Sequence, residues 1–435
     1  MRLFKFKRKL SKAKLLTCFG CLGVPMIALI LTIGTFYWRN RKVVLEVPTP
    51  AMPAVNARDD FFKAGTISKN MKHPSILSSP KPETMTLADM AANAKDVKAV
   101  IAALQPGFHK EYRENPIRSL AGIANMYPNF ALFRESARQM TGAAIYHDLT
   151  GNHRKAMELR LDAMELGVMA ANGGSLISDL VSDAIVAIAA NNMEWSFSKL
   201  NTNDLARMAQ RLEIIRDKAV PFSSVMKEEG DNSVSTFVAL SNAPSSIRER
   251  YSSAMADSSG NVPVVPKLTD FREYLKSEFT DKNQMAHQVG TFYNQFVEEV
   301  KTPYHLKQRT SPGDNAWLLS INGVGLQAWS AHVKAQSEID LISLEVALLR
   351  FKADNHRFPA SLSEVSPKYL KTIPVDPFNN NGPYRYQLKQ DGSYQLYGLG
   401  PDMIDHHGTS GKRPGEPGTD MVAGKLGRVP KFPTK

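Results

Sequence analysis

The sequence predicts an α+β protein with an N-terminal transmembrane helix, a mainly α-helical middle domain, and a C-terminal long helix followed by a small antiparallel sheet. Three observations predict this order. An uncharged apolar segment covers residues 15–38, apolar residues recur every three or four positions from about 86 to 220, and two alternating segments flank Asp391-Gly392. The expected parts are a basic tail (residues 1–14), a transmembrane helix (15–38), an extended stalk (43–84), a helical domain (85–310) and a C-terminal domain (316–435).

Residues 15–38 have the composition of a membrane anchor. They contain no Asp, Glu, Lys, Arg or His, and 24 residues rising 1.5 Å each span about 36 Å, enough for a hydrocarbon core of about 30 Å. Seven basic residues precede the segment and three follow it. The positive-inside rule therefore predicts a single-pass protein of the bacterial inner membrane, with a cytosolic N-terminus, periplasmic C-terminal domains and the lipid bilayer as a partner.

Two other interpretations of this segment are open. A cleaved signal peptide would need small residues at a cleavage site, and residues 34–38 (Gly-Thr-Phe-Tyr-Trp) provide a poor one. A lipoprotein would need its apolar run before the modified cysteine, whereas here the run continues after Cys18 and Cys21. We expect an uncleaved anchor.

The net charge of +12 does not indicate nucleic-acid binding, because it is concentrated beside the anchor. Residues 1–42 hold ten Lys or Arg and no acidic residue. The remaining 44 basic and 42 acidic residues leave a net charge of +2 for the rest of the chain. The only two cysteines lie in or at the edge of the anchor, so the exported part is expected to contain no disulfide.

Proline frequency and apolar spacing divide the exported part. The proline-rich residues 43–84 are expected to form an extended stalk with a short helical stretch near 59–64. The following segments are expected to form helices, with Thr86 capping the first and Gly151-Asn152 separating two of them. The predicted later elements are a helical hairpin (residues 131–170), a buried helix (176–190), a surface helix (201–219), a Ser- and Asn-rich loop (230–266), further helices (268–301) and one long helix (316–349).

The C-terminal segment changes character after the long helix. Apolar or aromatic residues alternate with polar ones in residues 384–388 and 393–397, which predicts a hairpin around Asp391-Gly392. Five motifs lie in order between residues 339 and 422: Leu349-Arg350-Phe351, Asn355-His356-Arg357-Phe358-Pro359, Ile373-Pro374-Val375-Asp376-Pro377, the Tyr384/Tyr386 strand, and Tyr397-Gly398-Leu399-Gly400-Pro401-Asp402. This part of the chain resembles the globular domain of the type II secretion major pseudopilin. More weakly, the whole chain resembles membrane-anchored exported bacterial proteins of unassigned function.

The pseudopilin resemblance implies a calcium site in the loop after the last strand. Asp402 matches the first aspartate of that loop, Asp420 the last, Asp405 is an additional candidate, and the Leu399 carbonyl is a further ligand. Calcium prefers six to eight oxygen ligands, and water would supply the remainder. Two alternatives are open: the aspartates solvate a Gly- and Pro-rich turn, or His406-His407 help to bind a transition metal.

The chain departs from pseudopilins because about 300 residues separate its anchor from the similar segment, so assembly into a pilus is not expected. No phosphate loop, nucleophile elbow, dinucleotide fingerprint or paired-histidine helix occurs in the sequence. The scattered histidines are interpreted as ordinary helix residues: His147, His153 and His332. We therefore expect a structural or protein-binding envelope protein, with secretion proteins among the possible partners. The alternative is an envelope hydrolase or transferase, which a cluster of buried acids and histidines would favour.

Overall fold

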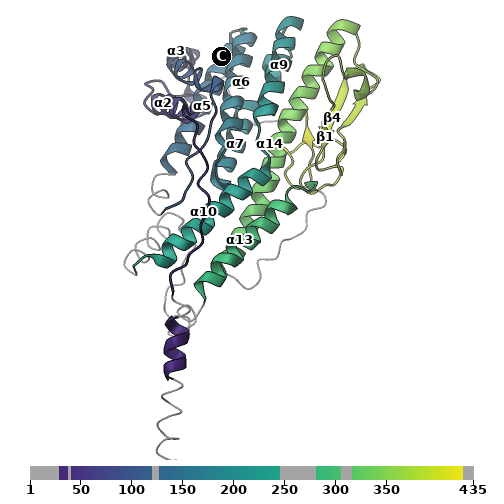
Figure 1. Cartoon of the computed structure of the whole chain (residues 1–435). Coiled ribbons are helices and arrows are strands. Elements are labelled where there is room, and N and C mark those ends of the chain that lie inside the picture. The colour runs from purple at the N-terminus through teal and green to yellow at the C-terminus, as the bar shows by residue number, and fades with distance from the viewer. Residues whose placement is uncertain (1–28, 38–40, 120–126, 245–280, 305–315, 425–435) are drawn as a thin grey trace, which may run out of the picture. The chain divides into compact units, whose positions relative to one another are not determined.

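The computed structural model describes residues 29–37, 41–119, 127–244, 281–304 and 316–424. Helices predominate in these residues, and the strands form two small antiparallel sheets, so the predicted mixed α+β class is confirmed (Figure 1). Contacts divide the chain into two compact units. One combines residues 1–46 with 237–289, and the other combines residues 47–236 with 290–435. The helical region and the C-terminal segment, expected as separate domains, therefore lie mainly in one unit.

The first unit contains the end of the predicted anchor. Residues 29–37 are helical, and their apolar side chains are exposed, with Leu31 at 64% and Ile33 at 58%. Residues 15–28 and 38 of the anchor lie outside the described residues. After the anchor, the backbone of Val43 is bound at both its N–H and its C=O by the side-chain amide of Asn242, at 3.0 and 2.9 Å.

The second unit contains layers of packed helices. α6 lies against α5, α7 and α9, and these helices run side by side in Figure 1. Side-chain caps begin several of them: Thr86 and Asp89 form a capping box on α3, and Asn152 and Asn201 cap α6 and α9. The helical elements of this part are α2 (Ala57–Lys69), η1 (Pro82–Thr84), α3 (Leu87–Leu104), η2 (Gly107–His109), α5 (Tyr127–Leu149), α6 (His153–Ala170), α7 (Leu176–Ala190), α8 (Glu194–Phe197) and α9 (Thr202–Lys218).

α7 is a core helix, as its apolar sequence predicts. Among the described residues, only the stretch Leu176–Phe197 is long and apolar enough to cross a membrane, but 61% of its most apolar window is buried inside the protein. α7 packs against α5, α6 and α14. Its first backbone N–H, that of Leu176, donates to the carboxylate of Glu229 at 3.0 Å, which replaces a side-chain cap from Ser175.

The structure differs from the expected stalk, because α2 belongs to the helical layers. Phe61 is fully buried, and the centroid of its ring lies 5.7 Å from that of Tyr112 and 6.4 Å from that of Phe133. Gly65 lets α2 approach α5 closely, since an added Cβ would lie 2.6 Å from the Cβ of Leu132. The surrounding prolines concealed this helix, whose buried residues recur at helical spacing.

A second difference concerns the predicted loop at residues 230–266. Residues 230–242 belong to α10 (Phe222–Asn242), and residues 245–280 lie outside the described part of the chain. The Ser and Asn residues of α10 are bonded across the fold: Ser233 donates to the Tyr293 hydroxyl at 3.0 Å, and Asn232 accepts from the Ile117 N–H at 2.9 Å. Tyr293 lies on α13 (Lys282–Glu299), one of the helices expected at residues 268–301.

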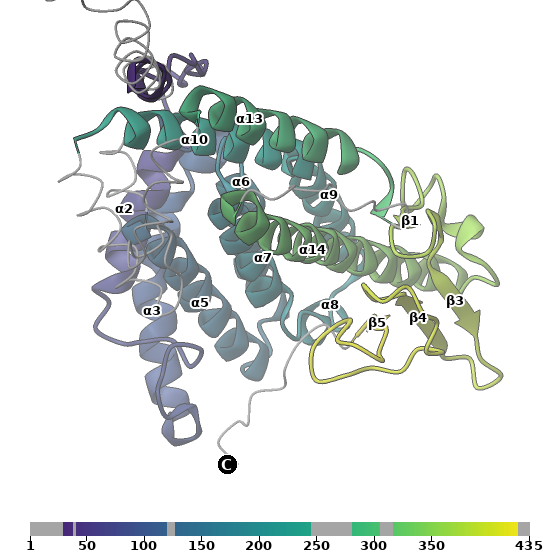
Figure 2. The ribbon, with the colours of Figure 1, turned by 90° about the horizontal axis from the view of Figure 1, so that it is seen from below.

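The C-terminal segment has the predicted order of a long helix and a hairpin. α14 lies between α7 and the three-stranded sheet (Figure 2). β3 pairs with β4 antiparallel, with Arg385 opposite Tyr397 and Leu388 opposite Tyr394, so the predicted hairpin is confirmed. Between α14 and the strands the chain forms one 3₁₀ turn, η4. The elements are α14 (Ala316–Asn355), η4 (Leu362–Val365), β1 (Val375–Asp376), β2 (Gly382–Pro383), β3 (Arg385–Leu388), β4 (Tyr394–Gly398) and β5 (Met421–Val422).

Candidate functional site

The predicted calcium ligands lie in a loop that bonds to itself. The carboxylate of Asp402 accepts from the Gly418 N–H at 3.1 Å and lies 3.1 Å from the His406 Nε2. Buried Asp420 accepts from the N–H groups of His406 and Gly408 at 3.3 and 2.7 Å. These two aspartates therefore hold the two arms of the loop together through backbone N–H donors.

Asp405, a further predicted ligand, also has partners, and so does the N–H of Leu399, whose carbonyl is the fourth predicted ligand. Asp405 accepts from the Tyr397 hydroxyl at 3.0 Å and lies 3.4 Å from the Arg385 Nε. The Leu399 N–H donates to buried Asp376 at 2.8 Å. Partial burial raises the pKa of Asp402, but hydrogen bonds outweigh it and the pKa falls below the usual value; the same balance holds for Asp405.

A second group of potential ligands lies between α7 and α14. Asp179, Asp183 and His332 each place one potential ligand atom within 4.8 Å of the other two. Among the described residues, this is the one such group of three His, Cys, Asp or Glu side chains. Asp179 and Asp183 are four residues apart on α7 and therefore share a face. The Nδ1 of His332 lies 2.9 Å from the Oδ1 of Asp179.

This group combines burial with incomplete hydrogen bonding. Asp179 is fully buried, His332 is 8% exposed and Asp183 is half-buried. Among the described residues, no donor reaches the Oδ2 of either Asp179 or Asp183. An unsatisfied buried carboxylate oxygen is costly, so each of these atoms requires an explanation.

The surroundings of the group are strongly acidic. Glu338, one and a half turns beyond His332 on α14, has a buried Oε2 that receives no hydrogen bond from any described residue. Burial raises the pKa of Glu338 to about 7, although nearby Lys334 opposes the shift. Burial also raises the pKa of Asp183 well above its usual value, and the carboxylates of Asp179 and Glu338 add to this shift.

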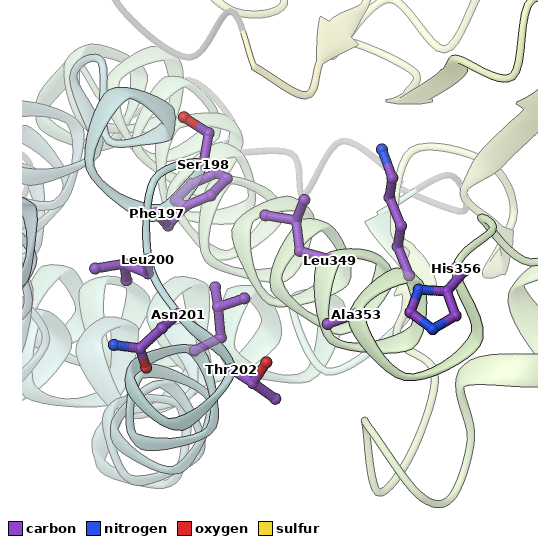
Figure 3. A pocket seen from close by; sticks show the side chains of 10 residues that line it. Phe197, Ser198, Leu200, Asn201, Thr202, Leu349, Ala353 and His356 are labelled. Atoms are coloured by element: carbon purple, nitrogen blue, oxygen red, sulfur yellow. The ribbon is translucent and has the colours of Figure 1, made fainter.

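A separate surface pocket of about 500 Å³ lies where α14 ends beside the beginning of α9 (Figure 3). Leu349, Ala353 and His356 line it from the α14 side, and residues 197–205 line it from the other. The amide of Asn201 is already used, because it caps α9 and also donates to Asp204. The lining contains no paired acid and histidine, and the Asp179, Asp183 and His332 group lies outside it.

No protein family, curated protein or solved structure matches the chain. The chemistry of the site must therefore be argued from its own residues. Two carboxylates and an imidazole suit cation binding or proton exchange, but they are enclosed by helices. Asp179 and Asp183 fall in the segment that the sequence predicts as a buried helix, and His332 was interpreted as an ordinary helix residue. The available signal was the spacing of four between two acids in a helix expected to be buried.

Proposed function

We propose that the chain is a single-pass protein of the bacterial inner membrane whose exported body has a structural or protein-binding role. The observation that carries the proposal is the charge pattern around residues 15–38, with seven basic residues before the uncharged segment and three after it. The exposed apolar side chains of residues 29–37 suit contact with lipid. In this arrangement the helices and strands of residues 47–435 lie on the periplasmic side.

The contacts of the C-terminal motifs support a pseudopilin-like module. Phe358, just after α14, packs edge-on against Tyr394 of the hairpin at 4.7 Å between ring centroids. The Tyr386 hydroxyl donates to the Pro359 carbonyl at 2.7 Å. Asp376 accepts the N–H groups of Phe378 and Leu399 and so joins two of the five motifs. Residues that carry the resemblance therefore contact one another, as parts of one folding unit should. A role linked to type II secretion follows from this resemblance alone.

An envelope hydrolase or transferase is the second candidate, and the cluster of Asp179, Asp183 and His332 is the observation that favours it. Its burial favours a structural role instead, because a catalytic group must reach a substrate. The surface pocket described above does not include the cluster. We therefore place the binding role first.

Cysteine labelling in cells tests the proposed topology. With Cys18 and Cys21 replaced by Ser, a single cysteine is introduced at exposed Lys389, in the turn between β3 and β4, and labelled with a membrane-impermeant maleimide. In intact spheroplasts, the maleimide should label the Lys389→Cys variant without lysis. The matched variant Lys5→Cys should label only after lysis. The reverse pattern, or labelling of both only after lysis, would contradict the proposal.

A further inference from the structure

We propose that Asp179, Asp183 and His332 bind one divalent transition-metal ion of the Zn²⁺ class, which fastens α7 to α14. The proposal concerns a site separate from the predicted calcium loop, and it does not depend on the membrane topology. Its first support is the pair of buried Oδ2 atoms on Asp179 and Asp183, which accept no hydrogen bond from any described residue. A cation would supply the missing partner for both atoms.

The spacing of the cluster suits metal coordination after small side-chain movements. Zn²⁺ binds carboxylate oxygen and imidazole nitrogen at about 2.0–2.1 Å, so two ligands of a tetrahedral ion lie about 3.3 Å apart. The Asp179 Oδ1 and the His332 Nδ1 are 2.9 Å apart, and the three ligand atoms lie within 4.8 Å of one another. A metal bound by both oxygens of Asp179 could therefore replace the proton between its Oδ1 and the His332 Nδ1, and would also give the Oδ2 its missing partner.

An ion pair alone explains only part of the arrangement. A protonated His332 would satisfy the Oδ1 of Asp179, but it would leave the Oδ2 of Asp179 without a partner. It would also leave Asp183 beside another carboxylate on the same helix face. Two neighbouring buried carboxylates repel each other, and either a proton on Asp183 or a divalent cation would remove that repulsion.

The ligand types select the class of metal. An imidazole nitrogen with two carboxylates suits Zn²⁺ and related transition metals, whereas Ca²⁺ and Mg²⁺ prefer sets of oxygen ligands. Three protein ligands leave at least one position for water or for a further side chain. Glu338, six residues after His332 on α14, also has a buried oxygen that receives no hydrogen bond from the described residues.

Thermal unfolding of the full chain in detergent tests the proposal. The protein is stripped with a chelator, and its Tm is measured alone, with a small excess of Zn²⁺, and with millimolar Ca²⁺. Zn²⁺ should raise the Tm by about 3 °C or more, because it binds only the folded arrangement, and Ca²⁺ should have little effect through this site. Co²⁺ should give visible absorption bands at one equivalent per chain.

Variants separate the site from adventitious binding. Asp183→Asn and His332→Gln should each abolish the Zn²⁺-dependent rise, and Asp183 is only half-buried, so its variant should fold. Asp148→Asn is the matched control, because Asp148 also contacts a histidine, His153, at 3.1 Å but has both oxygens bonded. It should keep the Zn²⁺ response. A missing response in the unmodified chain, an unchanged response in Asp183→Asn, or a response lost in Asp148→Asn would overturn the proposal.

Discussion

Aspartates gather in two regions of the molecule, the loop at residues 399–420 and the interface of α7 with α14, and they are bonded differently in each. In the loop, both oxygens of Asp402 and of Asp420 accept hydrogen bonds, mostly from backbone N–H groups. Between the helices, Asp179 and Asp183 each keep one buried oxygen without a donor among the described residues. The two regions therefore differ in their unsatisfied carboxylate oxygens, and this difference, rather than the number of aspartates, is the reason for proposing a cation between the helices.

The largest expected effect on stability concerns Glu345. This side chain is buried like Asp179, but both of its oxygens accept hydrogen bonds, so it shows the effect of burial alone. Burial, reinforced by Glu194, raises its pKa to about 8, while bonds from Tyr394 and Gly424 oppose the shift. The folded state therefore holds this proton between about pH 4.5 and 8, so stability falls as the pH rises through that window. Glu345→Gln should remove this loss, which is on the order of 4 kcal/mol between pH 5 and pH 9, as measured by urea unfolding at the two pH values.

The same slope against pH in Glu345→Gln and in the unmodified chain would contradict the assigned burial of this carboxyl. The glutamine suits the site, because its oxygen can accept from Gly424 and its amide can donate to the Tyr394 hydroxyl.

Asp420→Ala should give the next largest effect and shows the structural role of the loop acids. The substitution leaves two N–H groups, those of His406 and Gly408, without their acceptor in a buried position. We expect a loss of about 3 kcal/mol in the free energy of unfolding. Asp420→Asn keeps one acceptor oxygen and should lose about half as much. A loss below about 0.5 kcal/mol for the alanine variant would show that the loop does not depend on this carboxylate.

Asp183→Asn should have an effect of the opposite sign in metal-free protein. Asparagine is neutral, so folding no longer has to bury or protonate a second carboxyl group beside that of Asp179, one turn earlier on α7. We expect a gain of about 1 kcal/mol in the free energy of unfolding when a chelator is present. A loss of similar size would mean that the Asp183 carboxylate already has a stabilising partner without metal.

Asp402→Asn should give the smallest effect. Asp402 lies near the surface, and asparagine keeps an oxygen for the Gly418 N–H, so only the charge assistance is lost. We expect a change of about 0.5 kcal/mol. The calcium prediction for this loop is tested with the same variant. A Tm that rises with calcium in the unmodified chain, but not in Asp402→Asn, would support a calcium site there.

Local patterns predicted most of the elements. The surface helix predicted at residues 201–219 forms as α9, and the apolar residues at helical spacing along it are buried: Leu205, Met208, Leu212 and Ile215. The Asp391-Gly392 turn identified the hairpin of β3 and β4. These elements were predictable because their signals lie within a few residues of sequence.

Features that depend on distant contacts were missed. The sequence placed α2 in a stalk. The helix instead packs in an aromatic cluster with Tyr112 and Phe133, which are distant in sequence and therefore give no local signal. The α7–α14 cluster joins Asp179 to His332 across 153 positions of sequence. A single sequence gives the type of each residue but not this pairing, so the cluster was not predicted.

Zn²⁺ titration calorimetry on the metal-stripped full chain compares the two regions most directly. We expect one Zn²⁺ per chain, retained in Asp402→Asn and lost in Asp183→Asn. The Asp402 variant tests the loop, because Asp402 lies beside His406 and the pair is another place where an aspartate and a histidine could hold Zn²⁺. A site lost in Asp402→Asn and retained in Asp183→Asn would overturn the proposal and place the metal in the loop.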